Sequence, residues 1–129
     1  RPWSPDTLNA REFGPVCIGA STGAQESEDC LTLNIWRPQG KHTDLPVIVY
    51  IHSGLNQRGS SQDPLRQGDM IVQSEKYPAI YVTFNYRLGI FGWLESLPQA
   101  RWTHNVGLRD QQAALAWVNR NIAFFGVHP

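Results

Sequence analysis

The chain has 129 residues, of which 41% are hydrophobic and 17% charged, the balance of an ordinary globular domain. Its 11 basic and 11 acidic residues cancel, so charge gives no argument for binding nucleic acid or an anionic membrane surface. No apolar run approaches the roughly 20 residues of a membrane-spanning helix, so no membrane span is expected.

Three strands are expected in the first two thirds of the chain. Residues 1–29 are interrupted by proline and glycine and predict irregular structure. The stretch LTLNIW at 31–36 alternates apolar and polar residues, as a half-buried strand does. VIVYIH at 47–52 and AIYVTFNYR at 79–87 are almost continuously apolar, which is typical of strands buried on both faces of a sheet.

Two helices are expected beside these strands. MIVQSEKY at 70–77 predicts a short helix, and the segment 105–126 predicts a long one. Asn105 is a plausible N-cap of the long helix and Gly126 a plausible stop. Its sheet-facing residues are expected to be Leu108, Gln111, Gln112, Leu115, Val118, Ile122 and Phe125. Between strand and helix, an aromatic-rich loop carries Phe91, Trp93 and Trp102, which we interpret as packing residues.

Buried strands that alternate with helices indicate an α/β fold, with a mostly parallel sheet and helices on its faces. The long helix is expected to lead into a further parallel strand, and without one the sheet would keep an open edge. We therefore expect residues 1–129 to be a portion of a larger domain.

Four stretches of the sequence resemble, in the same order, motifs of the type-B carboxylesterase/cholinesterase family of α/β hydrolases. They are SEDCLTLN at 27–34, PVIVYIHSG at 46–54, TFNYRLGIFGWL at 83–94 and NVGLRDQQAALAWVNRNIAFFG at 105–126. The resemblance implies that residues 1–129 run from the N-terminal disulfide loop of that domain to the helix before its nucleophile.

The cysteines and one pair of charges acquire expected roles from this resemblance. By number alone, Cys17 and Cys30 could form one disulfide or remain two buried thiols. The resemblance implies the disulfide, and with it a secreted protein or one of the secretory pathway. It also implies a buried ion pair between Glu28 and Arg87, since a lone charge beside apolar strands would be costly.

No catalytic triad residue is expected in this chain. Ester hydrolysis by this fold needs a nucleophilic serine on a G-x-S-x-G turn, an acid and a histidine. The resemblance places all three beyond residue 129. It also matches none of the chain's histidines to the catalytic one, so we interpret these as ordinary surface or loop residues: His42, His52, His104 and His128.

The resemblance does place half of an oxyanion hole here. The family motif H-G-G-G corresponds to His52-Ser53-Gly54-Leu55, and the backbone N–H groups of Gly54 and Leu55 would face the developing oxyanion. Glycine allows the backbone to approach a substrate closely. A leucine keeps its N–H, but its side chain would either narrow the acyl pocket or block the hole.

The implied function is therefore part of a carboxylic ester hydrolase that acts on a small-molecule ester together with the remainder of the same polypeptide. No cofactor or metal site is expected, because the sequence has no phosphate loop, dinucleotide fingerprint or metal-ligand spacing. Two alternatives remain. Leu55 and Val127-His128 depart from the family pattern, which favours a non-catalytic cholinesterase-like binding or adhesion module. The chain could also be a small independent domain.

Overall fold

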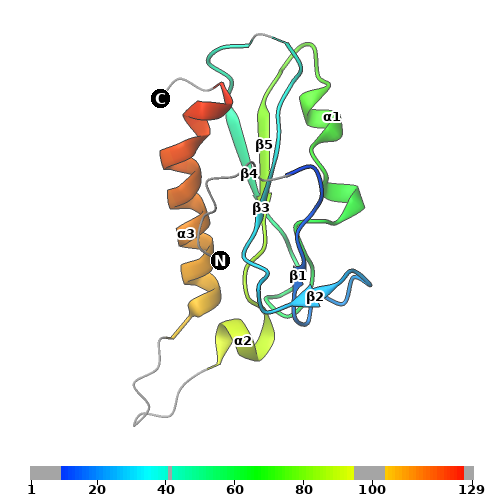
Figure 1. Ribbon diagram of the computed structural model, residues 1–129, viewed down its shortest axis with the longest axis vertical. Coiled ribbons are helices and arrows are strands. Elements are labelled where there is room, and N and C mark those ends of the chain that lie inside the picture. The colour runs from blue at the N-terminus through cyan, green and yellow to red at the C-terminus, as the bar shows by residue number, and fades with distance from the viewer. Residues whose placement is uncertain (1–9, 41, 95–103, 127–129) are drawn as a thin grey trace.

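A three-stranded mixed sheet forms the centre of the protein in a computed structural model, which describes residues 10–40, 42–94 and 104–126 (Figure 1). Its strands are β3 (Leu33–Trp36), β4 (Val47–Ile51) and β5 (Ile80–Phe84), in the order β3-β5-β4. β4 runs parallel to β5, whereas β3 runs antiparallel to it. The expected α/β fold is confirmed, and within this part of the chain the sheet is mixed.

Helices flank the sheet, with α3 on one side and the short α1 on the other (Figure 1). The expected helix at 70–77 is only one turn long, and a third helix, α2, forms inside the expected aromatic loop. Trp102 of that loop lies outside the described residues. The helices are η1 (Pro64–Arg66), α1 (Asp69–Val72), α2 (Gly89–Trp93), α3 (Val106–Asn121) and η2 (Ile122–Phe125).

The strands differ in burial, which corrects one expectation. All five residues of β5 are buried, as predicted for a central strand. β4 is not buried on both faces, since Ile48 and Ile51 are 44% and 39% exposed. The reason is topological: β4 is an edge strand in this sheet, so its continuous apolar run is only partly covered.

The buried face of α3 also differs from the predicted one. Val118 and Ile122 pack against Ile80 and Val82 of β5, as expected. Leu108 and Leu115, however, are 44% and 43% exposed, because the apolar side of α3 is wider than three strands can cover. The buried polar residue of this helix is Asp110.

The ends of α3 agree with the sequence at one terminus only. Asn105 precedes the helix with a left-handed backbone, φ 52° and ψ 43°, and its side chain makes no capping hydrogen bond. Gly126 ends η2 with φ 96°, and its N–H donates to the carbonyl of Ala123. A glycine in this left-handed conformation is the expected helix stop.

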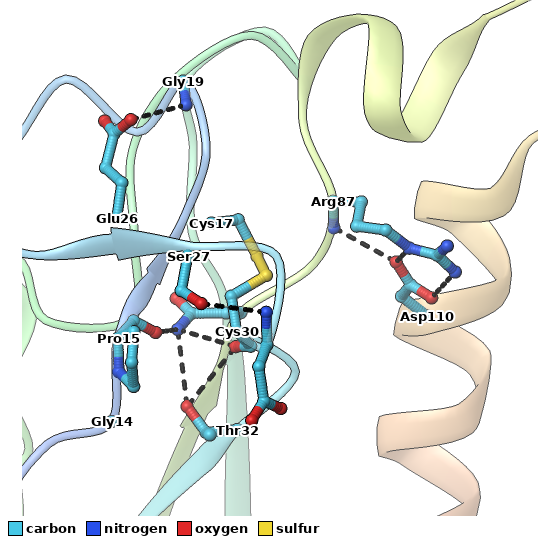
Figure 2. Close-up of a disulfide and its surroundings, with 12 residues drawn as sticks. Gly14, Pro15, Cys17, Gly19, Glu26, Ser27, Cys30, Thr32, Arg87 and Asp110 are labelled. Carbon is cyan, nitrogen blue, oxygen red and sulfur yellow. Dashed lines mark hydrogen bonds and ion pairs between the residues drawn. A yellow bond between two sulfur atoms is a disulfide. The ribbon is translucent and has the colours of Figure 1, made fainter.

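A disulfide between Cys17 and Cys30 ties the N-terminal segment together, as the resemblance implied (Figure 2). Both cysteines are buried and pack with Val16, Phe84 and Leu88. Two short strands, β1 (Val16–Cys17) and β2 (Glu26–Ser27), pair in parallel inside the loop that the disulfide closes. This loop is otherwise small and polar, so its order depends on the cross-link.

Replacing both Cys17 and Cys30 with alanine should lower the free energy of unfolding of the whole protein by about 3 kcal/mol. The reason is that the disulfide joins residues separated by 13 positions and so restricts the unfolded chain. Urea unfolding followed by circular dichroism measures the difference. Reductant should bring the wild-type protein to the same midpoint as the double variant. A reduced wild type with an unchanged midpoint would contradict the prediction.

Candidate active site

The candidate site is the loop that follows β4, at the edge where the carboxyl ends of parallel β4 and β5 meet. Ligands of open α/β sheets bind at such edges. His52, the first loop residue, is only 5% exposed and stacks on Tyr86, with ring centroids 4.4 Å apart. The Tyr86 hydroxyl donates a 3.0 Å hydrogen bond to the carbonyl of His52. The start of the loop is therefore fixed to the residues just after β5.

The loop turns sharply at Gly54. Its carbonyl accepts hydrogen bonds from the N–H groups of Gln57 (3.0 Å) and Arg58 (3.1 Å). Gly54 has φ 135°, and a Cβ placed on it would lie 1.9 Å from the carbonyl oxygen of Arg58. Because no side chain fits in that space, only glycine permits this turn.

Two non-glycine residues after Gly54 have left-handed backbones, Leu55 with φ 57° and Asn56 with φ 61°. Such conformations cost roughly 1–3 kcal/mol each and cluster at functional sites. The turn is held in place from outside, because the N–H of Gly89, at the start of α2, donates a 2.8 Å bond to the carbonyl of Asn56.

The N–H groups of Gly54 and Leu55 are the predicted oxyanion donors. Within the described part of the chain, neither donates a hydrogen bond. Both residues line an open hollow of about 710 Å³, and Leu55 also lines a second one of about 700 Å³ together with Ile90 and Trp93. The Leu55 side chain is 87% exposed. The structure thus places two consecutive residues with unused donors at the rim of two hollows.

The far end of the loop is held by buried polar residues that sequence reasoning missed. The Ser61 N–H donates to Oδ1 of Asn85 at 2.9 Å, and the Ser61 carbonyl accepts from the Thr83 hydroxyl at 3.1 Å. Nδ2 of Asn34 donates to the Ser61 and Thr83 hydroxyl oxygens at 3.0 and 3.1 Å. Asparagine is depleted in strands, so Asn34 and Asn85 beside apolar runs were an available signal.

Asn85 also connects this network to the disulfide segment. Its Nδ2 donates to the carbonyls of Pro15 and Cys30, at 3.2 Å each (Figure 2). The loop after β4, the central strand β5 and the N-terminal disulfide segment are therefore joined by hydrogen bonds through Asn85.

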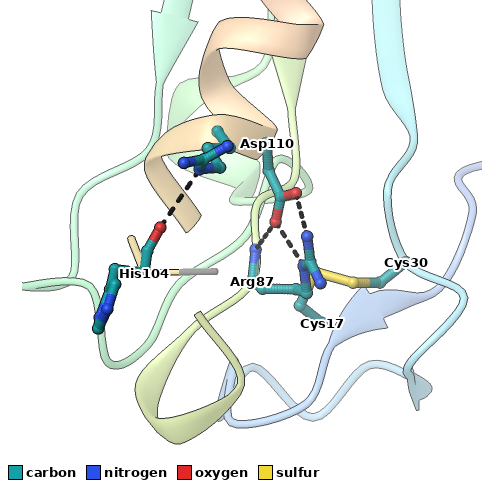
Figure 3. A network of polar contacts seen from close by, with 6 residues as sticks. Cys17, Cys30, Arg87, His104 and Asp110 are labelled. Atoms are coloured by element: carbon teal, nitrogen blue, oxygen red, sulfur yellow. Dashed lines mark hydrogen bonds and ion pairs between the residues drawn. A yellow bond between two sulfur atoms is a disulfide. The ribbon is translucent and has the colours of Figure 1, made fainter. Parts of the chain in front are cut away.

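The predicted ion pair between Glu28 and Arg87 is wrong, because Arg87 pairs with Asp110 of α3 (Figure 3). Nε and Nη2 of Arg87 donate to the two carboxylate oxygens at 2.7 and 2.6 Å, and the Arg87 backbone N–H adds a third bond of 3.1 Å. Hydrogen bonding to Asp110 raises the pKa of Arg87. Glu28 is exposed and so needs no counter-ion, whereas the buried Asp110 does.

One pentapeptide has the letters of a serine motif, which sequence reasoning overlooked: Gly19-Ala20-Ser21-Thr22-Gly23. Its context is not a strand–turn–helix elbow, because it lies in the loop between β1 and β2. Ser21 does line the larger hollow, and it has a left-handed backbone with φ 55°. Its hydroxyl, however, donates to the carbonyl of Gly19 and makes no bond to a histidine.

Two of the other histidines, His42 and His104, lie in the described part of the chain. His42 contacts the carbonyl of Gln39 through Nε2, and the carbonyl of His104 accepts a bond from Arg109. His128 lies outside the described residues. Among the residues that the structure describes, no group of three or more histidine, cysteine, aspartate or glutamate side chains could hold a metal ion.

Protonation of His52 should destabilise the protein, because burial lowers the pKa of His52 below its ordinary value of 6.5. The unfolded chain then takes up the proton more readily, so stability should fall as the pH drops below about 6.5. Urea midpoints of the whole protein between about pH 7.5 and pH 5 measure this loss. His52→Phe keeps an aromatic ring on Tyr86 but cannot titrate, so its midpoint should fall less steeply. An equal or steeper fall would contradict the prediction.

Comparisons with known proteins agree on one family. Residues 1–129 match the family model described as the Carboxylesterase family. Bile salt-activated lipase of Rattus norvegicus is 43% identical over 133 residues, covering 95% of this chain and 22% of the lipase. Para-nitrobenzyl esterase of Bacillus subtilis is 38% identical over 133 residues, covering 96% of this chain and 27% of the esterase. A solved PNB esterase structure superposes with a TM-score of 0.83 at 41% identity, over 96% of this chain and 26% of that one.

The mixed sheet, its flanking helices and the glycine turn after a parallel strand define the class: the chain forms part of an α/β-hydrolase fold. It belongs to the carboxylesterase family. The chain spans about a quarter of the length of the relatives that it matches.

Proposed function

We propose that the whole protein is a serine carboxylic ester hydrolase, in which residues 1–129 form part of the carboxylesterase domain and supply one half of its oxyanion hole. The observation that carries this proposal is the pair of unused N–H donors, on Gly54 and Leu55, at the rim of the 710 Å³ hollow. Fixed donors of this kind stabilise the negative charge that develops on an ester carbonyl during attack. The nucleophile, acid and histidine would come from the remainder of the polypeptide.

The fixed loop supports this role. Catalytic donors must be aligned before the reaction, so that they do not reorganise when charge develops. Here the turn is held at His52 by Tyr86, at Asn56 by Gly89 and at Ser61 by Asn85. The strain in the left-handed Leu55 and Asn56 is thus balanced by contacts on three sides.

Leu55 affects which ester can bind beside the proposed oxyanion donors. Its side chain is exposed and lines both hollows, so it occupies space beside the donors. We propose that it narrows the pocket for the acyl part of the ester. The same observation, an exposed Leu55 beside the donors, favours the second candidate, a non-catalytic cholinesterase-like binding or adhesion module in which Leu55 blocks the hole.

The protein is also proposed to be secreted. A disulfide persists in oxidising compartments, and one relative, 39% identical over 133 residues, is named a secreted lipase. Among the described residues, no helix is long and apolar enough to cross a membrane. The proposed partners are the rest of the same polypeptide and a small-molecule ester.

A fluorophosphonate probe separates the two candidate functions. It should label the whole protein at one serine in a stoichiometric reaction, and 4-nitrophenyl acetate should be hydrolysed. Peptide mapping should place the label outside residues 1–129, while Ser21→Ala should still be labelled. Absence of both labelling and turnover would overturn the hydrolase proposal and leave the binding module. A label on Ser21 would overturn the assignment of the nucleophile to the remainder of the polypeptide.

A further inference from the structure

Arg58 belongs to the candidate site by position. The turn that begins at Gly54 ends at Arg58, whose N–H donates to the Gly54 carbonyl at 3.1 Å. The stem of the arginine then runs along Gly54, since a Cβ built on Gly54 would lie 3.2 Å from Cγ of Arg58. The guanidinium is therefore carried on the same rigid turn as the proposed oxyanion donors, within a side chain's length of them.

Arg58 also differs from the other described arginines in having no partner. Each of the other described arginines has a partner: Asp110 for Arg87, the hydroxyl and ring of Tyr50 for Arg66, backbone carbonyls for Arg37, Arg109 and Arg120, and a further contact for Arg11. Within the described ranges, the Arg58 guanidinium has neither an ion pair nor a hydrogen bond.

Arg58 brings a positive charge to the lining of the larger hollow. Among the described residues that line it, Arg58 is the one charged side chain, and the other polar lining groups are neutral, including Ser21, Thr22 and Gln111. The nearby carboxylate of Glu26 is held by the N–H groups of Gly19 and Ser21, from which it accepts hydrogen bonds, and it forms no ion pair with Arg58. An unpaired cation in a concave site attracts anions and repels cations.

We propose that Arg58 selects ester substrates that carry an anionic group, such as a carboxylate or sulfonate, while the N–H groups of Gly54 and Leu55 face the scissile carbonyl. This inference rests on the proposed hydrolase function. A guanidinium suits the role because its planar fork binds two oxygens of a carboxylate or sulfonate at once. Esters with a quaternary ammonium group would be disfavoured by the same charge.

Two matched pairs of esters test the proposal in the whole protein. One pair is an aryl acetate with and without a sulfonate on its ring, which places the anion in the alcohol part. The other is a methyl hemiester of a dicarboxylic acid against the methyl ester of a monocarboxylic acid of equal length, which places it in the acyl part. The measured quantity is the ratio of kcat/KM for the anionic ester to that for the neutral one.

Arg58→Gln should lower this ratio about tenfold for at least one pair, as expected for losing one close charge contact. Arg58→Lys should retain most of it, and raising salt from about 0.05 to 0.5 M should reduce the preference of the wild type. Arg120→Gln removes the same charge from the exposed end of α3 and should leave the ratio unchanged. Equal ratios in wild type and Arg58→Gln for both pairs would overturn the inference.

Binding measured by calorimetry distinguishes a failure of the anion-selection inference from a failure of the hydrolase proposal. Non-hydrolysable amides replace the two anionic esters and their neutral counterparts. If the fluorophosphonate does not label the protein and no ester is turned over, the hydrolase proposal fails. Tighter binding of an anionic amide that is lost in Arg58→Gln would then still support the anion site, whereas equal or absent binding would overturn it.

Discussion

Replacing Gly54 with alanine should lower kcat for ester hydrolysis by about 10²–10³-fold, the range seen when one oxyanion donor is lost. The new Cβ would lie 1.9 Å from the carbonyl oxygen of Arg58 and 2.6 Å from its carbonyl carbon, so the turn must open. Opening the turn breaks the bonds that Gly54 accepts from Gln57 and Arg58. It also redirects the N–H groups that are proposed to face the oxyanion.

The loss should appear in kcat more than in KM, because the donors act on charge that develops only in the transition state. Steady-state kinetics with 4-nitrophenyl acetate in the whole protein measures both constants. A kcat within threefold of the wild type would contradict the prediction.

Gly23→Ala is the matched control for backbone strain. Gly23 also has a positive φ, 78°, but a Cβ there would meet nothing within 4 Å. Gly23→Ala therefore also places a side chain on a residue with positive φ, but without a clash and outside the turn at Gly54. Thermal unfolding of both variants separates a local change at Gly54 from general loss of structure. Both variants should still unfold cooperatively, with Gly54→Ala the less stable because it loses the turn's two hydrogen bonds, and only Gly54→Ala should show the large loss of kcat.

The sequence could predict the elements that long patterns define. The apolar runs at 47–52 and 79–87 became β4 and β5, and the alanine-rich segment became α3. Periodicity reports which elements form but not where each lies in the sheet. The exposure of β4 follows from its edge position, which the run itself did not reveal.

The geometry of the candidate site was less predictable. The resemblance located Gly54 and Leu55. The residue types at 55 and 56 did not predict that both Leu55 and Asn56 have left-handed backbones. Within the described ranges the Arg58 guanidinium has no ion pair or hydrogen bond, and nothing in the sequence indicates this. Its unpaired state depends on residues distant in the sequence, and local patterns carry no information about these.

Asp110 was missed for a different reason. Sequence reasoning on amphipathic helices assigns charged residues to the solvent side. Asp110 nevertheless follows the four-residue spacing of Ala114, Val118 and Ile122, so it lies on their face of α3. Of these, Val118 and Ile122 are buried in the core between helix and sheet. A carboxylate within such a series predicts a buried partner, which the structure identifies as Arg87.

Replacing Asp110 with asparagine should lower the free energy of unfolding by about 2–3 kcal/mol. Breaking a fully buried pair costs roughly 3–5 kcal/mol, and the value here is discounted because the Arg87 side chain is 38% exposed. The Asp110 carboxylate accepts three hydrogen bonds from Arg87, whereas the amide would turn a donor toward the guanidinium. Urea unfolding of the whole protein measures the change.

Asp110→Asn should also loosen the residues after β5 that pack against the candidate site. The Asp110 carboxylate accepts the N–H of Arg87, and the residue before Arg87, Tyr86, stacks on His52 at the start of the loop after β4. Asp29 is exposed and has no ion pair with another described residue, so Asp29→Asn should change stability by less than about 0.5 kcal/mol. In a double-mutant cycle, Asp110→Asn and Arg87→Gln should show a coupling of at least about 1 kcal/mol. Additive effects would mean that the pair does not act as a unit.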